Sequence, residues 1–325
     1  MPSPNAVFTE LVSTTFRKHS KEIKDNISKN NALLERLGIK GTRKEDGGLS
    51  ITAPLDYAAN GTYQRYSGYD VLNIGASDVI SAAEYQWRQI AINVVASGLE
   101  LRTNSGDSRI INLVKARMKN AIRTFKNNFS ADIYGDGTLP NQIGGLQSLV
   151  SDTGAGTVGG IDSSVWAFWR SQVQSAAAPL QGGAAITPGA TTMESLMLPL
   201  WLSLIRGDDQ PDLIVSDNNY FSFYEQSQTS LKRYTGSESA GKAAGGFVSL
   251  KYKTADVIFD GGSGIPTNRM YFLNTDYLDL VVHKDADMAI MDEMKPYNQD
   301  AAVIPILWMG NMVCTNRSLQ AVLRA

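Results

Sequence analysis

The sequence predicts an α+β fold, a mixture of helices and strands with no repeating unit. Apolar residues from Ile110 to Phe129 recur at helical spacing, which predicts one helix of about seven turns. Alternating or continuous apolar segments predict strands at 49–57 and 211–217, and in three further runs between residues 247 and 316. Several shorter helical segments lie between these strands, so the sum is an α+β pattern.

The composition narrows the class of protein. A chain of 325 residues with 43% hydrophobic and 19% charged residues is typical of a globular protein with a large core or two packed domains. The net charge of −2 does not favour nucleic-acid binding by the whole chain, although one face can still be basic. The N-terminus lacks a signal-peptide pattern and no apolar run reaches about 18 residues, so we expect a cytoplasmic product without a membrane span.

Residues 1–46 are predicted to form an N-terminal arm. Up to Glu45 they contain nine basic and five acidic residues, the strongest charge asymmetry in the chain. The pattern favours a helix from Glu22 to Leu37 that ends at Gly38, but few apolar residues are available to hold it in a core. A solvated tail is the alternative interpretation of the same composition.

Residues 49–74 are predicted to form an extended hairpin. Alternate residues from Leu49 to Tyr57 are apolar, Pro54 favours an edge strand, and Asn60-Gly61 is the strongest two-residue turn signal in the chain. Its aliphatic content is too low for a core of its own, so the hairpin either packs on its own domain or reaches toward a neighbouring subunit. The return side carries tyrosines beside an arginine: Tyr63, Arg65, Tyr66 and Tyr69.

Residues 79–101 are predicted to form one long strand that precedes the long helix. Asp107 or Ser108 can cap the helix, and Gly135 ends it. The face of the helix opposite its apolar stripe has two interpretations. It is either exposed to solvent or lies against a negatively charged surface. That face carries only basic charges: Arg109, Lys115, Arg117, Lys119, Arg123 and Lys126.

The chain after Gly137 is predicted to be mixed. The capping pattern Thr191-x-x-Glu194 begins a helix that runs to Arg206, bends at Pro199 and ends at Gly207. A helix is predicted over 218–228 after the strand at 211–217, and residues 236–246 have the composition of a flexible loop.

The segment GAGTVGG, residues 154–160, has the glycine spacing of a dinucleotide-binding turn. Such a turn needs a buried strand directly before the first glycine and an acidic residue about 20 positions later. Here polar residues 151–153 intervene, and after Asp162 the next acid is Glu194. A nucleotide-binding enzyme is therefore a disfavoured alternative. The glycines are interpreted as a tight turn into a helix that Asp162 caps and that contains Trp166.

No catalytic, cofactor-binding or metal site is predicted, so the chain is not expected to be an enzyme. His19 lies in the polar arm and His283 at the end of an apolar strand, where a surface histidine is common. Cys314 is the single cysteine, which excludes an internal disulfide, and its apolar strand suits a buried inert thiol. The acids of 285–293 lack the spacing of a calcium loop.

The order of segments over residues 45–325 resembles the major capsid proteins of tailed bacteriophages, which have the Hong Kong 97-like fold. The segments that carry the resemblance are the tyrosine-bearing hairpin at 49–74, the strand and long helix at 99–137, the glycine-flanked loop and tryptophan segment at 143–173, the strand and helix at 211–228, the strands at 256–282, and the closing segment "VIPILWMGNMVCTNRSLQAVLRA" at 303–325.

The resemblance implies a division of the chain into the parts of that fold. These are an N-terminal arm at 1–46, an E-loop hairpin at 47–78, a peripheral domain with the long spine helix at 79–138, an axial domain at 139–300, and a strand at 301–325 that returns to the peripheral domain. The arm and the hairpin would hold neighbouring subunits. The contact residues expected on them are Arg17, Lys18, Lys21, Arg65, Tyr66 and Tyr69.

The implied function is structural: a subunit of the icosahedral head shell of a tailed double-stranded DNA bacteriophage, assembled in the host cytoplasm and found in the virion. The implied partners are other copies in pentamers and hexamers, a portal protein, a possible decoration protein, and packaged DNA in nonspecific contact. The absence of a long scaffolding region before the arm implies a separate scaffold protein. No Lys–Asn crosslinking pair is recognisable. The alternative within the same fold is the shell of an encapsulin-type nanocompartment.

Overall fold

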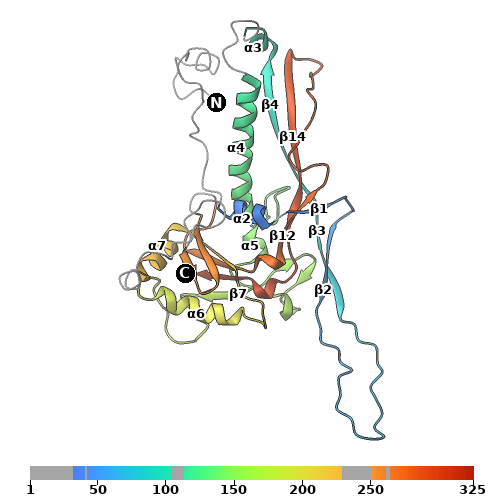
Figure 1. Cartoon of the computed structure of the whole chain (residues 1–325), viewed down its shortest axis with the longest axis vertical. Helices are drawn as coiled ribbons and strands as arrows, with labels where there is room; N and C mark the ends of the chain where they lie inside the picture. The colour runs from blue at the N-terminus through green and yellow to red at the C-terminus, as the bar shows by residue number, and fades with distance from the viewer. Residues whose placement is uncertain (1–31, 41, 104–112, 229–249, 261–263) are drawn as a thin grey trace.

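The computed structural model describes residues 32–40, 42–103, 113–228, 250–260 and 264–325. The molecule is elongated (Figure 1). A long helix and two long strands extend from one side of a central body, and a hairpin projects from the body in the opposite direction. The mixture of helices and sheets confirms the predicted α+β class.

A six-stranded mixed sheet forms the central body. Its middle strands are buried, in agreement with the continuous apolar runs that predicted them. In spatial order the strands are β7 (Gln172–Ser175), β15 (Ala321–Arg324), β11 (Arg269–Leu273), β8 (Leu213–Ser216), β10 (Ala255–Phe259) and β9 (Leu250–Tyr252).

Helices α6 (Met193–Ser203) and α7 (Asn218–Ser227) pack against this sheet and confirm two predicted helices. The Asp217 carboxylate caps α7 by accepting a hydrogen bond from the backbone N–H of Tyr220 at 3.0 Å. The capping pattern expected for α6 is wrong by one residue, because Thr192 precedes the helix and its hydroxyl instead donates to the Thr187 carbonyl at 2.7 Å. Pro199 lies inside α6 as expected.

A five-stranded sheet carries the long strands. Strand β14 (Ala301–Cys314) pairs along its first ten residues with β4 (Arg88–Ser97) and along its last five with β12 (Leu278–His283). Short strands β13 (Ala289–Ile290) and β1 (Arg43–Glu45) complete this sheet by pairing with β14 and β12. Gly310 pairs with both partners of β14, and a Cβ there would overlap the Val281 carbonyl, so this crossing point requires glycine.

The predicted long helix is α4 (Leu113–Ile133), which lies along β4 and β14 (Figure 1). Its inner face packs on the strands through Met118, Ala121 and Ile122, which contact Val94 and Ile306. The helix ends as predicted in a turn in which the Gly135 N–H donates to the Asp132 carbonyl at 2.9 Å. The expected caps Asp107 and Ser108 lie outside the described residues.

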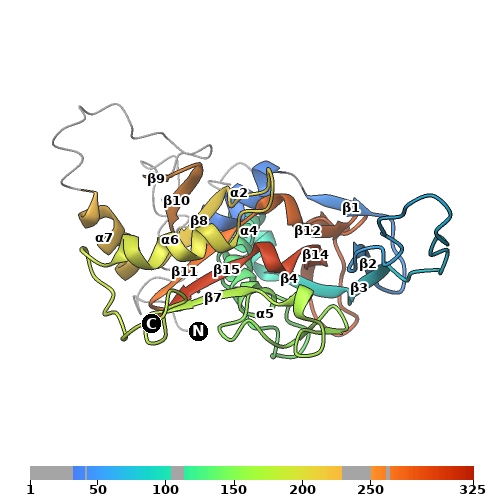
Figure 2. The same ribbon diagram turned by 90° about the horizontal axis from the view of Figure 1, so that it is seen from below.

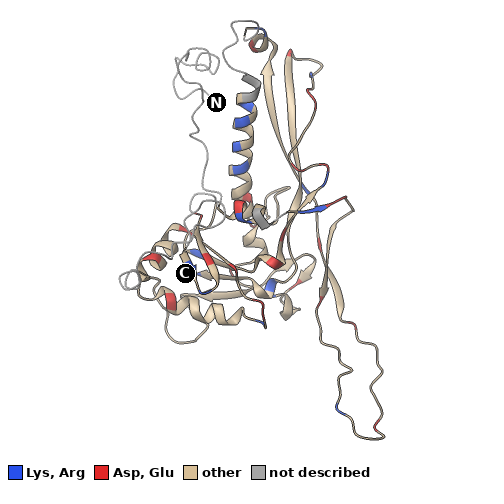
Figure 3. Cartoon of the chain, in the orientation of Figure 1, with Lys and Arg blue, Asp and Glu red and all other residues tan. Residues whose placement is uncertain are grey.

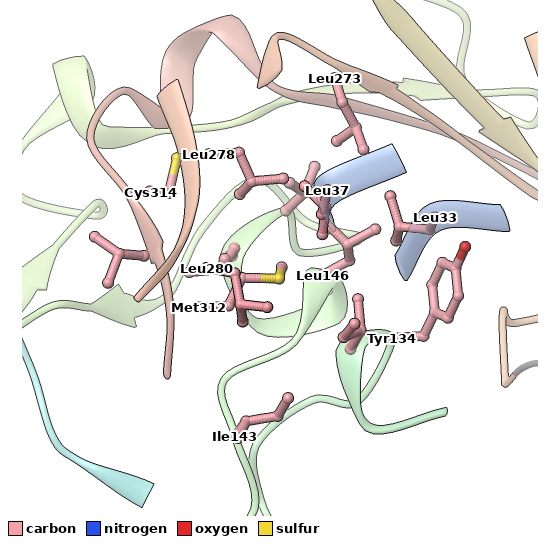
Figure 4. Packing of buried hydrophobic residues seen from close by; sticks show 14 of the residues in the cluster. Leu33, Leu37, Tyr134, Ile143, Leu146, Leu273, Leu278, Leu280, Met312 and Cys314 are labelled. Carbon is pink, nitrogen blue, oxygen red and sulfur yellow. The ribbon is translucent and has the colours of Figure 1, made fainter. Parts of the chain in front are cut away.

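The main core lies where the two sheets meet (Figure 4). Leu278, Leu280, Met312 and Cys314 from β12 and β14 face residues from α2 (Ala32–Lys40), α4 and α5 (Leu146–Leu149). This core is continuous across both sheets, so the folding of one sheet depends on the other.

The predicted arm is shorter than expected at its C-terminal end. Leu33 and Leu37 of α2 are fully or almost fully buried in the main core, although the sequence suggested too few apolar residues for such a role (Figure 4). The Leu33 N–H donates to the buried Asp260 carboxylate at 3.1 Å, and β1 pairs in parallel with β12. Residues 32–40 and 43–45 therefore belong to the folded body. The larger part of the expected arm, 1–31, is outside the described residues.

The single strand predicted over 79–101 is wrong. The segment forms β3 (Ile80–Tyr85), then β4, then the short helix α3 (Gly98–Thr103). Strand β3 pairs with β2 (Ile51–Asp56), whereas β4 pairs with β14, and the strand is interrupted at Gln86-Trp87. A period-two pattern continues through both strands and cannot reveal that they have different partners.

The predicted helix after Asp162 is also wrong. Residues 157–162 form the small hairpin of β5 (Thr157–Val158) and β6 (Ile161–Asp162), followed by a single 3-10 turn, η1 (Ala167–Trp169), and then β7. Asp162 does accept a backbone hydrogen bond, from Ser164 N–H at 2.8 Å, but this closes a turn rather than a helix. Pairing of β7 with the buried β15 overrides the local helical pattern.

The strand assignments also change the implied division of the chain. Strands β12 and β13, within the range 139–300, belong to the five-stranded sheet, whereas the C-terminal β15 belongs to the six-stranded sheet. The 3-10 turns η2 (Thr275–Tyr277) and η3 (Arg317–Leu319) lie at two of the three places where the chain passes between the sheets, and the third lies between β4 and β7. We therefore propose one unit built on each sheet, with the chain crossing between them three times. The expected loop at 236–246 lies outside the described residues.

Candidate functional site: the projecting hairpin and its base

The projecting hairpin runs in one register from Ile51 to Tyr85. Strands β2 and β3 pair Ile51 with Tyr85 and Asp56 with Ile80. Beyond the strands the register continues, because the Tyr57 N–H donates to the Val79 carbonyl at 2.9 Å and Gln64 bonds both Val71 and Asn73. The two limbs of the hairpin therefore stay aligned as they leave the body (Figure 1).

The tip of the hairpin lies at residues 67–70, so the turn expected at Asn60-Gly61 is wrong as the point of reversal. The Asp70 N–H donates to the Ser67 carbonyl at 3.1 Å, and the Ser67 N–H donates to the Asp70 carboxylate at 2.8 Å. Gly68 has a φ of +54°, which such a turn favours. Asn60 only bends the outgoing limb, by accepting from the Thr62 N–H.

The limbs of the hairpin carry large apolar side chains that no other part of the described chain covers. Such a set of exposed apolar side chains is unusual for a soluble monomer. Burial of each side chain would remove apolar surface from water, which lowers the free energy. The exposed residues are Tyr63, Tyr66, Tyr69, Val71, Leu72, Ile74 and Ile80.

Three of the six expected contact residues lie on this hairpin. Arg65, Tyr66 and Tyr69 are all exposed near the tip, so the structure leaves them available to a partner. The other three, Arg17, Lys18 and Lys21, lie outside the described residues.

The base of the hairpin is anchored firmly in the main core. Ile51, Ala53 and Ala83 are fully buried, and the Tyr85 hydroxyl donates to the Cys314 carbonyl at 2.8 Å. Burial raises the pKa of Tyr85 well above its ordinary value, with the nearby Cys314 as a smaller cause. Burial likewise raises the pKa of Cys314 to about 12, which confirms the predicted inert thiol.

The glycine loop at 154–160 supports the hairpin. The Gly159 carbonyl accepts a hydrogen bond from the Glu84 N–H of β3 at 3.0 Å. Gly159 has a φ of +59°, and a Cβ on it would lie 2.7 Å from the Cβ of Ala83. The loop has a two-residue strand on either side of Gly159-Gly160 and no helix starting at the third glycine, so it lacks the geometry of a dinucleotide site. Its glycines serve the tight turn and the close approach to β3.

Arg317 holds the other end of this loop, and sequence reasoning did not single it out. Its side chain is fully buried, and its Nε donates to the Leu149 carbonyl at 2.7 Å while Nη1 reaches the Gly156 carbonyl at 3.5 Å. Burial lowers the pKa of this guanidinium. The carbonyls that Arg317 bonds lie more than 160 residues away in the sequence, so no local sequence pattern indicates this role.

A groove of about 670 Å³ lies between the base of the hairpin and the segment that follows the glycine loop. One wall is β3, and the other contains the aromatic cluster of Tyr57, Trp166 and Phe168, whose rings contact edge to face or tilted at 5.5–6.2 Å. Three carboxylates line the groove, and none of the described residues in its lining is a lysine or an arginine. The carboxylates are Asp78, Glu84 and Asp162.

The basic face of α4 is a second candidate surface (Figure 3). Part of its charge is balanced within the chain: Arg117 bonds Glu100 of α3 at 2.9 Å, and Lys126 lies 3.9 Å from Glu35 of α2. The Arg117 hydrogen bond is the largest cause that lowers the pKa of Glu100 to about 2. Lys119 remains exposed. Acidic residues of the neighbouring helices α2 and α3 therefore balance part of the positive charge of this face.

The described residues contain no arrangement typical of an enzyme site. No group of three or more His, Cys, Asp or Glu side chains in this part of the chain is placed to bind a metal ion. His283 accepts a hydrogen bond from the Asp285 N–H at 3.1 Å and packs edge-on against Trp87, as an ordinary surface histidine would. Within the same described residues, no helix is long and apolar enough to cross a membrane.

Solved structures of capsids are similar to this chain. No protein-family model and no curated protein matches the sequence. The capsid of cyanophage A-1(L) matches 95% of this chain and 96% of its own with a TM-score of 0.68 at 16% identity. The capsid of a native GTA particle matches 99% of each chain with a TM-score of 0.60 at 11% identity.

An encapsulin is also among the similar structures. The holo-SrpI encapsulin complex from Synechococcus elongatus matches 98% of this chain and 95% of its own, with a TM-score of 0.56 at 8% identity. Because these matches cover nearly the whole length of both chains, they confirm the predicted fold: the chain has the Hong Kong 97-like capsid fold.

Proposed function

We propose that this chain is the major capsid protein of a tailed double-stranded DNA bacteriophage and that it assembles into the icosahedral head shell. The observation that carries the proposal is the hairpin, which presents seven large apolar side chains outside the body of its own chain (Figure 1). The similar phage capsids support the same reading. In this reading the protein is structural and needs no catalytic site.

The partner that best fits the hairpin is another copy of the chain. Full burial of one such apolar side chain stabilises a contact by about 1.5–3 kcal/mol, so a few of them suffice for a specific interface. The hairpin lies at one end of the molecule and the long strands at the other, which suits heterologous contacts between copies, and such contacts form rings when their rotation closes. Five- and six-fold rings are the ones an icosahedral shell needs.

The proposal includes further partners besides other copies of the chain. Packaged DNA fits the exposed Lys119 on α4, through loose, salt-sensitive contact. A separate scaffold protein, a portal protein and a decoration protein belong to the same proposal, as do assembly in the host cytoplasm and residence in the virion.

Particle formation tests the proposal. The full chain, expressed with the proteins encoded beside it in the native source, should yield closed particles by negative-stain electron microscopy and a fast boundary in sedimentation velocity. A chain that remains monomeric across protein concentrations and ionic strengths, with the scaffold present, would contradict the proposal.

An encapsulin-type shell is the second candidate, favoured by the match to the encapsulin over 98% of this chain. The contents of purified particles separate the two functions. DNA protected from nuclease indicates a phage head, whereas a single abundant cargo enzyme in mass spectrometry indicates a nanocompartment.

A further inference from the structure

Asn60 and Gly61 form an exposed pair on the outgoing limb of the hairpin, which stands clear of the body (Figures 1 and 2). The Asn60 Oδ1 accepts two hydrogen bonds from Thr62, one from the backbone N–H at 2.9 Å and one from the hydroxyl at 2.8 Å. Within the described chain, the Asn60 Nδ2 has no hydrogen-bond partner. A Cβ built on Gly61 meets no atom within 4 Å, so the space around its backbone nitrogen is open.

An asparagine that precedes a glycine can react with its own main chain, because the reaction is intramolecular and no side chain blocks it. The Gly61 nitrogen loses its proton to hydroxide and attacks Asn60 Cγ, and the electron pair of the side-chain carbonyl moves onto Oδ1. The Cγ–Nδ2 bond then breaks, and Nδ2 takes a proton from water and leaves as ammonia. The product of this step is a cyclic succinimide.

The two hydrogen bonds from Thr62 lie where negative charge develops in this reaction. Oδ1 becomes an oxyanion in the tetrahedral intermediate, and hydrogen bonds to a charged oxygen are stronger than those to a neutral amide oxygen. The leaving group, Nδ2, is not held by any described residue. We propose that Asn60 is a self-modification site, at which the chain converts asparagine into aspartate and isoaspartate with the Thr62 hydroxyl promoting ring closure.

Water completes the conversion by adding to one of the two ring carbonyls. Addition at Cγ breaks the bond from Cγ to the Gly61 nitrogen and leaves aspartate at position 60. Addition at the main-chain carbonyl carbon leaves isoaspartate, in which the main chain runs through Cγ and is longer by one carbon. Either product replaces a neutral amide by a carboxylate, so the outgoing limb gains a negative charge. The conversion consumes only water and does not depend on assembly.

The chain also contains the same arrangement with a carboxylate in place of the amide. The Asp136 Oδ1 accepts from the Thr138 N–H at 3.1 Å and from the Thr138 hydroxyl at 2.8 Å, and Gly137 lies between the two residues. These hydrogen bonds lower the pKa of Asp136, so its side chain is ionised at neutral pH. A carboxylate is a poor electrophile and has no ammonia to lose. Position 136 is therefore an internal control for position 60.

Peptide mapping by mass spectrometry tests the proposal on the full, folded chain. The protein is incubated at pH 7 and at pH 9 in water labelled with a heavy oxygen isotope. We expect labelled aspartate and isoaspartate to accumulate at position 60, faster at pH 9 because the Gly61 N–H must lose its proton. Position 136 should yield at least fivefold less isoaspartate. A chain that retains asparagine at position 60 through the whole incubation would overturn the proposal.

Variants of Thr62 separate the role of the structure from the chemistry common to exposed Asn-Gly pairs. Thr62→Val removes the hydroxyl and keeps the backbone N–H and the branched shape, so it should slow the conversion at least threefold. Thr62→Ser keeps the hydroxyl and should preserve the rate. In urea, where the turn is lost, all three chains should convert at the same rate. Equal rates for the three folded chains, or the same loss for Thr62→Val with and without urea, would overturn the role of Thr62.

Discussion

Gly159 of the glycine loop accepts a hydrogen bond from strand β3 of the hairpin and lies against Ala83. Gly159→Ala should lower the free energy of unfolding by about 2–4 kcal/mol, because the new Cβ overlaps Ala83 and the left-handed backbone is unfavourable for alanine. Gly160→Ala is the matched control: its φ is +77° but no atom lies within 4 Å of the new Cβ, so the loss should be about 1–2 kcal/mol. Urea denaturation followed by tryptophan fluorescence measures both, and equal losses would show that the contact with β3 is unimportant.

Glu100 provides a pH-dependent contribution to stability. Arg117 lowers its pKa in the folded chain to about 2 from an ordinary value of 4.5, so the carboxylate stabilises the fold fully above pH 4.5 and loses this effect as the pH falls toward 2. Glu100→Gln should lower the thermal midpoint at pH 7 and lower it by much less at pH 2.5. Glu293→Gln, at an exposed position, is the control. A Glu100→Gln effect that is the same at both pH values would contradict the ion pair as its cause.

At the scale of single residues, the sequence could indicate exposed groups but not buried partnerships. Arg65, Tyr66 and Tyr69 were expected to be available, and they are exposed. Tyr85, Arg317 and the pair of Tyr134 and Asp260 were not singled out, because their partners lie more than 100 residues away in the chain. Such contacts are defined only once the sheets have formed.

In the proposed function, the hairpin contributes to assembly rather than to the fold. A deletion of residues 61–75 keeps Asn60 opposite Ala76 in the register of the limbs, so β2 and β3 should pair unchanged. We expect an unaltered urea midpoint and the loss of particles. Replacing Tyr63, Tyr66 and Tyr69 by serine keeps the length and should also reduce assembly. Normal particles from both variants would show that the hairpin makes no essential contact.

Helix α2 belongs to the core, in contrast to the arm that its sequence suggested. Leu33→Ala should lower the free energy of unfolding by about 2–5 kcal/mol because the side chain is fully buried. Glu35→Ala on the exposed face is the control, with a loss below about 1 kcal/mol. Circular dichroism during urea unfolding measures both, and a neutral Leu33→Ala would place α2 outside the cooperative unit.

At the scale of elements, strong local sequence patterns predicted the correct secondary structure. Where the local pattern was weak, pairing with distant strands determined the secondary structure. The long helix, the buried β8 with its following helix α7, and β14 were predicted, since each has a long or capped apolar pattern. The Trp166 segment was predicted as a helix but precedes a strand, because pairing with β15 outweighs local propensity. The reversal of the hairpin was misplaced because the Asn60-Gly61 signal does not lie at the centre of the register.

At the scale of the whole molecule, strand β14 connects the long helix, the main core and the base of the hairpin. Strand β14 pairs with β4 beside the long helix and with β12 next to the main core, and its C-terminal end receives the Tyr85 hydroxyl from the base of the hairpin. A force applied to the hairpin tip by a neighbour is therefore transmitted into the sheet that carries α4. This arrangement suits a subunit that is held at both ends.

The central claim is that the hairpin of each copy is covered by another copy of the chain. A cryo-electron microscopy reconstruction of the assembled particles tests it most directly. The account predicts a closed shell in which Tyr63, Tyr66 and Tyr69 of every copy are buried against an adjacent copy. A shell in which these tyrosines remain solvent-exposed, or a preparation that contains only monomers with free hairpins, would contradict it.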